Sequence, residues 1–142
     1  MNKKKISIVT PCFNEENSIL ECINSVRTIF NSELKDYYYE HIICDNSSTD
    51  NTFKILENEA LKDKNLKIIL NSRNFGPFKS MFNGMENAIG DAVIPFLPAD
   101  LQDPPEIIIE FVKKWEEGFS VVYGTRDIRQ EPMLKAFVRK IY

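Results

Sequence analysis

The stretch ISIVTPCFNEENSILECINSVRTIF, residues 6–30, decides the fold class because its hydrophobic spacing changes part-way along. Ile6, Ile8 and Val9 form a short β-branched run that stops at Pro11, and this predicts a strand. Between Ile19 and Phe30, apolar residues recur at three- and four-residue spacing, which predicts an amphipathic helix. The stretch therefore has the form of a strand followed directly by a helix.

The same alternation continues along the rest of the chain. Further strands are predicted over residues 37–44, 66–70, 92–97 and 119–123, and further helices over residues 53–60, 78–89 and 107–115. The run 92–97 is nearly all apolar, as expected for a strand that is buried on both faces of a parallel sheet. We therefore predict an α/β fold with an open, mostly parallel sheet and helices on both faces.

Local signals place the helix ends and the core residues. Residues 48–50 offer possible caps for the second helix, and Asp103 followed by Pro104 is typical of a helix start. Gly90 is expected to end the third helix, whose apolar stripe is expected to pack in the core. That stripe comprises Phe78, Met81, Phe82, Met85, Ala88 and Ile89.

Composition limits the class of protein. The chain has 142 residues, about the size of one domain, and 43% of them are hydrophobic. Eighteen basic and 21 acidic residues give a net charge of −3, which argues against a nucleic-acid-binding protein because such proteins usually carry a basic patch. The composition favours a single folded domain without nucleic acid as a partner.

The cysteines and the apolar runs indicate the compartment. Cys12, Cys22 and Cys44 show no CxxC spacing and His41 is the single histidine, so a zinc site is not expected; we predict reduced thiols in a cytosolic interior and a structural His41. The apolar run that follows the lysines at the N-terminus is too short for a signal peptide, and no run approaches the length of a membrane span. The expected location is the cytoplasm, with contact to a membrane surface possible.

The last segment, residues 130–142, has apolar residues at helical spacing with basic residues between them. One interpretation is a terminal helix that packs on the sheet. The other is a basic amphipathic helix that lies on an anionic membrane surface. The helical pattern runs to the last residue without a cap, so we expect residues 130–142 to be the start of a helix in a longer protein.

Polar clusters follow each of the first four predicted strands, at residues 10–16, 45–50, 71–76 and 98–103. Ligands of open α/β sheets bind beyond the carboxyl ends of the strands, so we expect all four clusters to meet at one edge. Caps and loops explain part of this polarity but do not require Arg73 and Lys79 close to Asp45 and Asp100. Cations that face carboxylates suit a diphosphate bridged by a divalent metal.

These clusters resemble the motifs of family-2 glycosyltransferases, which have the GT-A fold. The match spans most of the chain, and it is closest to the branch that transfers sugars from nucleotide donors to polyprenyl phosphate. The matching segments are TPCFNEE at 10–16, CDNSSTDNT at 44–52, RNFG at 73–76 and ADLQDPPEI at 99–107. The first two resemble the family's P-x-(Y/F)-N-E-E and D-(D/N)-x-S-x-D-x-T.

The resemblance implies roles for individual residues in nucleotide binding. Pro11, Phe13 and Glu15 would line the nucleoside pocket, and Asp45 would accept hydrogen bonds from N–H groups of the base. Arg73 would approach the phosphates. Lys79 would do so too, although the family's lysine more commonly follows the glycine directly, as it does not in FGPFK. The alternatives are a turn or capping role for Asp45 and solvated loop charges for the two cations.

The resemblance also implies a metal site and a catalytic aspartate. Asp100 and Gln102 match the end of the family's D-x-D element, and Asp100 would be both the metal ligand and the catalytic residue. The first acid of that element is Pro98 here, so one anionic ligand is missing. Magnesium or manganese could still be held by Asp100, Gln102 and the diphosphate, because such ions often need only one or two carboxylates.

The implied protein is an inverting glycosyltransferase, or its donor-binding half, with the nucleotide-sugar domain over residues 1–129. The donor would be a UDP- or GDP-sugar, and the acceptor a polyprenyl phosphate or a cell-surface glycan at the cytoplasmic face of a membrane. The alternative, prompted by Pro98, is a catalytically silent nucleotide-binding or scaffold domain. A dinucleotide-binding domain is disfavoured because no G-x-G-x-x-G follows the first strand.

Overall fold

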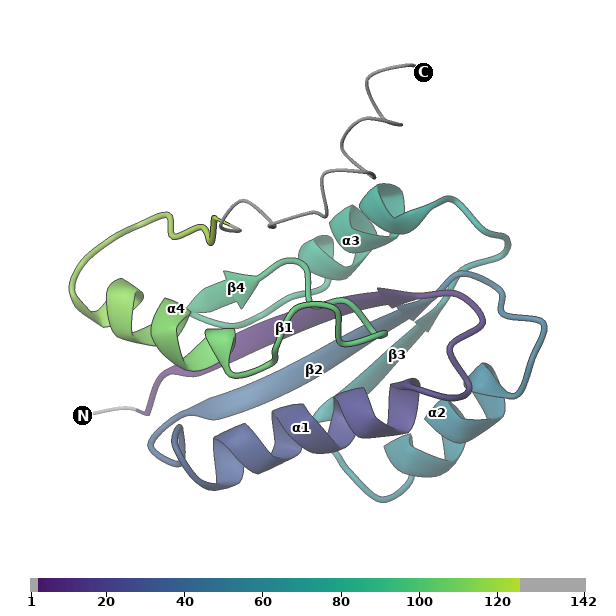
Figure 1. Cartoon of the computed structure of the whole chain (residues 1–142), viewed down its shortest axis with the longest axis horizontal. Coiled ribbons are helices and arrows are strands. Elements are labelled where there is room, and N and C mark those ends of the chain that lie inside the picture. The colour runs from purple at the N-terminus through teal and green to yellow at the C-terminus, as the bar shows by residue number, and fades with distance from the viewer. Residues whose placement is uncertain (1–2, 126–142) are drawn as a thin grey trace, which may run out of the picture.

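A computed structural model describes residues 3–125 and contains a four-stranded sheet in the order β3-β2-β1-β4 (Figure 1). All three strand pairings are parallel, so the carboxyl ends of the strands lie at the same edge. The elements are β1 Lys5–Cys12, α1 Ile19–Asn31, β2 Tyr38–Asp45, α2 Thr52–Ala60, β3 Leu66–Leu70, α3 Pro77–Glu86, β4 Ala92–Ile94 and α4 Ile107–Glu116.

The central pair is β1 and β2, and its register sets the position of everything at the carboxyl edge. The two strands pair over eight residues, from Lys5 opposite Tyr38 to Cys12 opposite Asp45. β1 is buried from Ile6 to Cys12, as expected for a central strand covered on both faces. Both strands therefore end at the same level, and the two loops that follow them start side by side.

Helices cover both faces of the sheet, as the sequence predicted. Ile6 and Ile8 point to one face and form a core with residues of α1 and α4, and α2 packs on the same face beside α1. Val9 points to the other face, where Met85 of α3 packs against it. The alternation of side chains along β1 thus separates two cores, with α3 alone on its side among the described helices.

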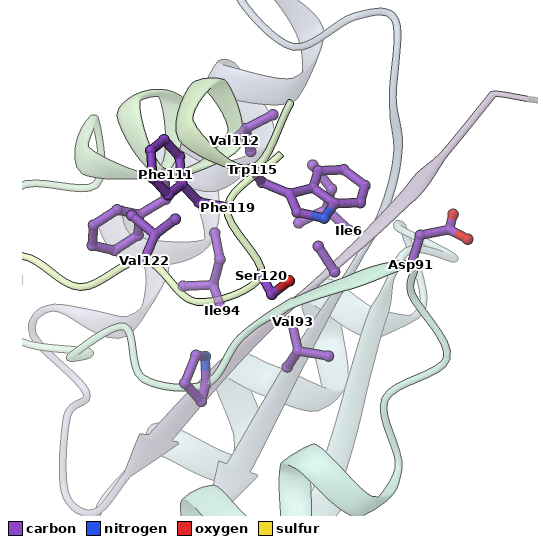
Figure 2. A pocket seen from close by; sticks show the side chains of 12 residues that line it. Ile6, Asp91, Val93, Ile94, Phe111, Val112, Trp115, Phe119, Ser120 and Val122 are labelled. Atoms are coloured by element: carbon purple, nitrogen blue, oxygen red, sulfur yellow. The ribbon is translucent and has the colours of Figure 1, made fainter. Parts of the chain in front are cut away.

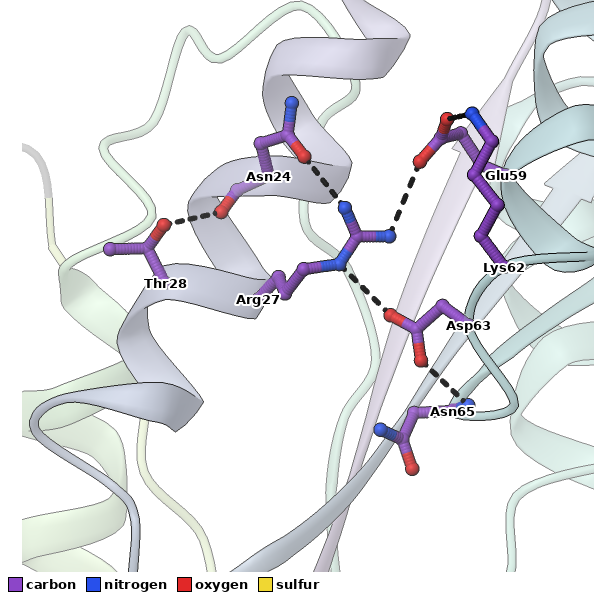
Figure 3. Close-up of polar contacts among 7 residues, drawn as sticks. All are labelled: Asn24, Arg27, Thr28, Glu59, Lys62, Asp63 and Asn65. Atoms are coloured by element: carbon purple, nitrogen blue, oxygen red, sulfur yellow. Dashed lines mark hydrogen bonds and ion pairs between the residues drawn. The ribbon is translucent and has the colours of Figure 1, made fainter.

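An ion-pair network joins α1 to α2 and to the turn before β3 (Figure 3). The Nε of Arg27 lies 3.0 Å from Asp63, and its Nη2 lies 3.3 Å from Glu59. Burial alone would raise the pKa of Asp63, but the Asn65 N–H and the Arg27 guanidinium together hold it below its ordinary value. Arg27 thereby links α1 both to α2 and to the turn before β3.

A buried carboxylate fixes the turn between α3 and β4. Glu40 of β2 accepts hydrogen bonds from the Ser7 hydroxyl at 2.5 Å and from the Ile89 N–H at 2.7 Å. The Gly90 N–H in turn donates to the Ser7 hydroxyl at 2.9 Å. Burial alone would raise the pKa of Glu40. The Lys67 ammonium, which lies 2.5 Å from Glu40 Oε2, and the hydrogen bonds from Ser7 and Ile89 outweigh burial and lower this pKa.

The prediction of a fifth strand over residues 119–123 is wrong. These residues run irregularly beside β4, where Phe119, Ser120 and Val122 help to line a cavity of about 260 Å³ (Figure 2). A strand needs a partner backbone, and β4 offers only the three residues before Pro95. Proline has no N–H for a ladder, so an apolar run alone could not form a strand here.

The other corrections concern the boundaries of β4 and α4. β4 ends at Ile94 rather than at Leu97 because of Pro95, although the Leu97 N–H still donates to the Val9 carbonyl at 2.9 Å. The α4 helix begins at Ile107, with Glu106 in the N-cap position. Asp103 is therefore not the N-cap residue, and the turn at residues 104–106 precedes the helix.

The stripe predicted for α3 is only partly correct. The helix ends at Glu86, and Phe78 and Phe82 are 69% and 59% exposed, whereas Ser80 and Gly84 are buried. The helix approaches the sheet so closely that a Cβ at Gly84 would lie 2.3 Å from Val9 Cγ1. Small residues therefore face the sheet, and the aromatic residues Phe78 and Phe82 point outward. Of the predicted stripe, Met85 and Ala88 pack against the core.

The three cysteines are buried and free, in agreement with the prediction of reduced thiols in the interior. Burial raises the pKa of Cys22 to about 12 and that of Cys44 to about 11, so both thiols stay protonated at neutral pH.

Among the described residues, no helix has the length and apolar character needed to cross a membrane. The same residues contain no group of three His, Cys, Asp or Glu side chains able to hold a metal ion.

His41 makes the stability of the fold depend on pH. It is 2% exposed, its Nε2 lies 2.8 Å from the Thr10 hydroxyl, and burial lowers its pKa to about 3. The unfolded chain binds a proton below about pH 6.5 and the folded chain does not, so stability is full above that pH and falls as the pH drops towards 3. We expect the free energy of unfolding to fall by about 2 kcal/mol between pH 7 and pH 5.

Urea unfolding at several pH values measures this effect, with His41→Gln as the comparison because glutamine is polar but does not titrate. The variant should show little change between pH 7 and pH 5, since the paired carboxylates titrate below that range. An equal loss of stability in both proteins would show that His41 is not the group responsible.

Candidate functional site

The four polar loops meet at the carboxyl edge of the sheet, as predicted, and surround a hollow of about 330 Å³. We call this hollow the strand-end pocket. Each of the four strands β1 to β4 contributes residues from the segment that follows it. The lining residues are Pro11, Cys12, Phe13, Glu15, Asn46, Asn74, Pro77, Phe96, Pro98, Ala99 and Asp100.

The loops after β1 and β2 are fastened to each other by reciprocal hydrogen bonds. The Asn14 N–H donates to the Ser48 hydroxyl at 2.9 Å, and the Thr49 N–H donates back to Asn14 Oδ1 at 2.8 Å. Asn51 donates to Glu16 Oε2 from its N–H at 3.0 Å and from its side-chain amide at 2.8 Å. We call these five residues the loop clasp, and they hold two walls of the pocket in fixed relation.

Asp50 and Thr52 extend the clasp into the start of α2. The Glu15 N–H donates to the Thr52 hydroxyl at 2.8 Å, and the Glu16 N–H donates to Asp50 at 3.2 Å. Burial would raise the pKa of Asp50, but the Thr52 hydroxyl and N–H outweigh it and the pKa is lowered. Much of the second motif therefore supports the backbone of the first.

Each of the four loops contains one residue in the left-handed region. These are Asn14, Ser47, Gly76 and Leu101, with φ values of 57°, 62°, 83° and 57°. Glycine adopts this region freely and asparagine tolerates it, but a leucine there is strained. Such strain persists where the surrounding structure fixes it, and it clusters at functional sites.

Asp45 is the last residue of β2 and directly precedes Asn46, which lines the pocket. It is fully buried, and it accepts hydrogen bonds from the Ser48 hydroxyl and from the Ser48 N–H at 3.2 and 3.3 Å. Cys12 Sγ lies 3.8 Å from its Oδ1. Cys12 and Asn46 line the pocket, whereas Asp45 does not, and its binding to a base stays a prediction.

Asn46 is a pocket residue that the sequence did not single out. Its Oδ1 accepts from Asn71 Nδ2 at 3.1 Å, and Asn71 Nδ2 also lies 3.0 Å from the Ser80 hydroxyl. Asn83 of α3 donates to Asn71 Oδ1 at 2.9 Å, so the chain of amides reaches from the helix to the pocket. The only sequence signal was that polar residues follow the buried strands β2 and β3 directly.

The two predicted cations lie outside the pocket lining. Arg73 is exposed, with its guanidinium carbon 4.7 Å from the centre of the Phe75 ring, and Lys79 is exposed on the first turn of α3. Their neighbours Asn74 and Pro77 line the pocket in their place. Both residues lie within two positions of a pocket-lining residue in the sequence, and their contacts with phosphates stay predictions.

Asp100 is exposed at the pocket, and its Oδ1 accepts the Gln102 N–H at 3.2 Å. Gln102 is exposed but does not line the pocket, and the carbonyl of Pro98 accepts the Leu101 N–H at 3.3 Å. The Asp100 carboxylate cannot enclose a metal by itself. It does suit an ion such as Mg²⁺, which keeps waters and takes its other ligands from substrate phosphates.

The family model for glycosyl transferase family 2 matches residues 7–140 of this chain. The chain belongs to this family. Curated relatives agree: a prophage bactoprenol glucosyl transferase homolog of Escherichia coli is 38% identical over 88% of this chain and 40% of its own length. An undecaprenyl-phosphate 4-deoxy-4-formamido-L-arabinose transferase of Proteus mirabilis is 38% identical over 96% of this chain and 41% of its own length.

Solved structures show the fold of this family 2 domain. TarS of Staphylococcus aureus in complex with UDP-GlcNAc aligns with a TM-score of 0.66 at 24% identity, over 89% of this chain and 38% of that one. A mannosyltransferase of Pyrobaculum calidifontis with GDP-Man and Mn²⁺ aligns with a TM-score of 0.65 at 20% identity, over 79% of this chain and 32% of that one. The predicted GT-A fold is thereby confirmed.

The family 2 domain is a glycosyltransferase domain, as the sequence predicted. The chain spans about two fifths of the length of the curated relatives it matches. The basic segment over residues 130–142 lies outside the described residues, so its predicted helix and the division at residue 129 remain predictions.

The loop clasp can be tested at Asn14, which both occupies a left-handed position and accepts the Thr49 N–H. Asn14→Gly removes the hydrogen bond but suits the backbone, so we expect a loss of about 1 kcal/mol in the free energy of unfolding. Asn14→Ala should lose about 1 kcal/mol more, because alanine is strained in this region. Chemical denaturation of the two variants beside the wild type measures the cost of the lost hydrogen bond and the cost of the backbone strain. An alanine variant as stable as the glycine variant would contradict the assigned strain.

Proposed function

We propose that this domain is the donor-binding half of an inverting glycosyltransferase that moves a sugar from a UDP- or GDP-sugar to a polyprenyl phosphate. The observation that carries the proposal is the strand-end pocket, which gathers residues from all four segments that resemble the family's motifs. Four segments that are separated along the sequence line one pocket, and a shared ligand accounts for their grouping at the carboxyl edge.

The pocket has the character of a nucleotide site. Its volume of about 330 Å³ is at the lower end of the range for small-molecule sites, and Pro11, Phe13 and Phe96 give it apolar walls. Phe13 and Phe96 are each 40% exposed, so their rings are available to a base. Neighbours of this fold have been solved with UDP-GlcNAc and with GDP-Man, which supports a nucleotide-sugar as the donor class.

A divalent metal fits the pocket only together with its ligand. Asp100 would hold the ion, with Gln102 beside it and the donor's diphosphate completing the coordination. The ion would neutralise charge on the departing diphosphate. Neighbours of this fold bind Mn²⁺ with a nucleotide, which supports a divalent ion without choosing between magnesium and manganese.

The proposed reaction is a single displacement at the anomeric carbon of the sugar. An oxygen of the acceptor phosphate forms the new bond to that carbon, and the bond to the nucleoside diphosphate breaks with its electron pair. Arg73, on the loop beside Asn74, would approach the charge that develops on the leaving phosphate. No proton has to leave the acceptor, because a phosphate monoester is largely a dianion at neutral pH.

The acceptor class is proposed from the relatives. Two of them carry names that specify bactoprenol or undecaprenyl phosphate, and a lipid phosphate removes the need for a general base. Such an acceptor would place the complete protein at the cytoplasmic face of a membrane. A cell-surface glycan would instead require a base to deprotonate its hydroxyl group.

A second candidate is a domain that binds nucleotide but transfers no sugar. The observation in its favour is Pro98, which lines the pocket where the family's first acid is expected and whose carbonyl already accepts the Leu101 N–H. With Asp100 as the one carboxylate of that element, metal affinity would be low. This candidate differs from the first in the chemistry it performs and not in the ligand it binds.

Calorimetry with UDP and GDP tests the proposed site. With Mn²⁺ present, we expect binding of at least one of these nucleotides, and we expect EDTA or Asp100→Asn to weaken it by roughly tenfold or more, equivalent to about 1.4 kcal/mol. Glu110→Gln is the matched control, because Glu110 is an exposed carboxylate on α4 that does not line the pocket. Its affinity should equal that of the wild type.

Equal nucleotide affinity with Mn²⁺, with EDTA and in Asp100→Asn would show that the metal has no role in binding. If neither UDP nor GDP binds, the proposed site is refuted. Pro98→Asp separates the two candidates when introduced into the complete protein. If the parent protein already transfers sugar, the silent candidate is excluded. If an inactive parent gains activity from this substitution, the silent candidate is correct.

A further inference from the structure

The side chain of Asn46 combines near-complete burial with an unused hydrogen-bond donor. It is 3% exposed and nevertheless lines the strand-end pocket. Its Oδ1 accepts from Asn71 Nδ2 at 3.1 Å and from the Phe75 N–H at 3.4 Å. Its Nδ2 makes no hydrogen bond with any residue in the described part of the chain, so a donor is left over at the pocket floor.

The orientation of this amide is determined by its neighbours. The Phe75 N–H can only donate, so the Asn46 atom that faces it has to be the oxygen. The opposite atom, Nδ2, is not sealed inside the protein, because no asparagine within residues 3–125 has a fully sealed side-chain atom that lacks a hydrogen bond. The Asn46 N–H groups are therefore presented to the pocket.

A fixed, neutral donor selects a particular kind of partner. Asp45 precedes Asn46 and is fully buried, and its negative charge disfavours a phosphate at this point. A neutral carbonyl oxygen suits the amide better. The keto oxygens of uracil and guanine accept hydrogen bonds, whereas cytosine and adenine carry amino groups that donate at the equivalent ring positions.

We propose that Asn46 selects the donor's base by donating a hydrogen bond to its keto oxygen, and that Asn71 is the positioning residue that keeps Asn46 in this orientation. This inference rests on the proposed function, since it assigns a contact within the same pocket. An amino-bearing base would bring two donors together and leave the buried amide without a partner, which makes the discrimination strong.

Asn71 fixes Asn46 through a network that continues into α3. Asn71 is 8% exposed, and its amide also contacts the Ser80 hydroxyl at 3.0 Å, which in turn donates to the Cys44 carbonyl at 3.3 Å. Asn83 donates to Asn71 Oδ1 at 2.9 Å and so determines which end of the Asn71 amide faces Asn46. Rotation of the Asn46 amide would break its bonds with Asn71 Nδ2 and with the Phe75 N–H.

The test compares nucleotides that differ in one keto or amino group. Calorimetry with Mn²⁺ measures the affinity ratios of UDP to CDP and of GDP to ADP. For the base that the pocket accommodates, we expect the keto nucleotide to bind at least about tenfold more tightly, equivalent to about 1.4 kcal/mol. In Asn46→Asp the inner oxygen still accepts from Asn71 and Phe75, but the pocket now faces an acceptor, so the ratio should fall by at least tenfold.

Asn83→Ala tests the positioning role without removing a residue that lines the pocket, and Glu86→Ala is its control on the same helix. Glu86 is an exposed residue of α3 that does not line the pocket. We expect Asn83→Ala to lower the keto preference several-fold and Glu86→Ala to leave it unchanged. Circular dichroism checks that each variant is folded, and the ratio is independent of a uniform loss of affinity.

The outcomes separate this inference from the function on which it rests. If UDP or GDP binds but the keto preference is absent, or is the same in Asn46→Asp, base selection by Asn46 is refuted and the nucleotide site stands. A preference that changes in Asn46→Asp but not in Asn83→Ala refutes only the positioning role. If none of the four nucleotides binds the wild-type chain with Mn²⁺, the proposed function and this inference both fail.

Discussion

The parallel pairing of β1 with β2 is the constraint on which the rest of the site depends. Because Cys12 lies opposite Asp45, both strands end at the same level and their loops begin side by side. The loop clasp then becomes possible, since Asn14 can donate to the Ser48 hydroxyl and accept from the Thr49 N–H across the gap. A register shifted by one residue would turn Asp45 to the other face of the sheet and separate the loops.

The structure divides the matched motifs into supporting residues and residues with free groups. Glu16, Asp50 and Thr52 use their side chains to accept hydrogen bonds from backbone N–H groups of the neighbouring loop. Asp100 and Asn46 instead keep a polar atom for the pocket, and they do so in opposite ways: one as an exposed carboxylate and the other as a buried donor. A residue of a matched motif thus need not contact a ligand to shape the site proposed to bind one.

The sequence predicted the fold because its strands and helices have clear and different hydrophobic spacing, as the agreement over Ile19–Asn31 and Leu66–Leu70 illustrates. The sequence-based prediction failed where contacts between elements distant in the sequence determine the local structure. Residues 119–123 are apolar but find no partner strand, and the aromatic residues of α3 turn outward because Gly84 brings the helix against Val9. The pocket does contain four of the predicted site residues, Pro11, Phe13, Glu15 and Asp100. The role of Asn46 could not be predicted in this way, because its orientation depends on hydrogen bonds from Asn71 and Phe75, which lie far from it in the sequence.

The central claim is that nucleotide and metal meet at the carboxyl edge of the sheet. Amide NMR spectra of the chain with UDP or GDP and Mn²⁺ test it most directly, because the paramagnetic ion broadens resonances of nearby residues. The account predicts the strongest broadening around Asp100 and nucleotide-dependent shifts at Phe13 and Asn46. Broadening centred on another acidic group, such as Glu59 and Asp63 beside Arg27, would contradict it.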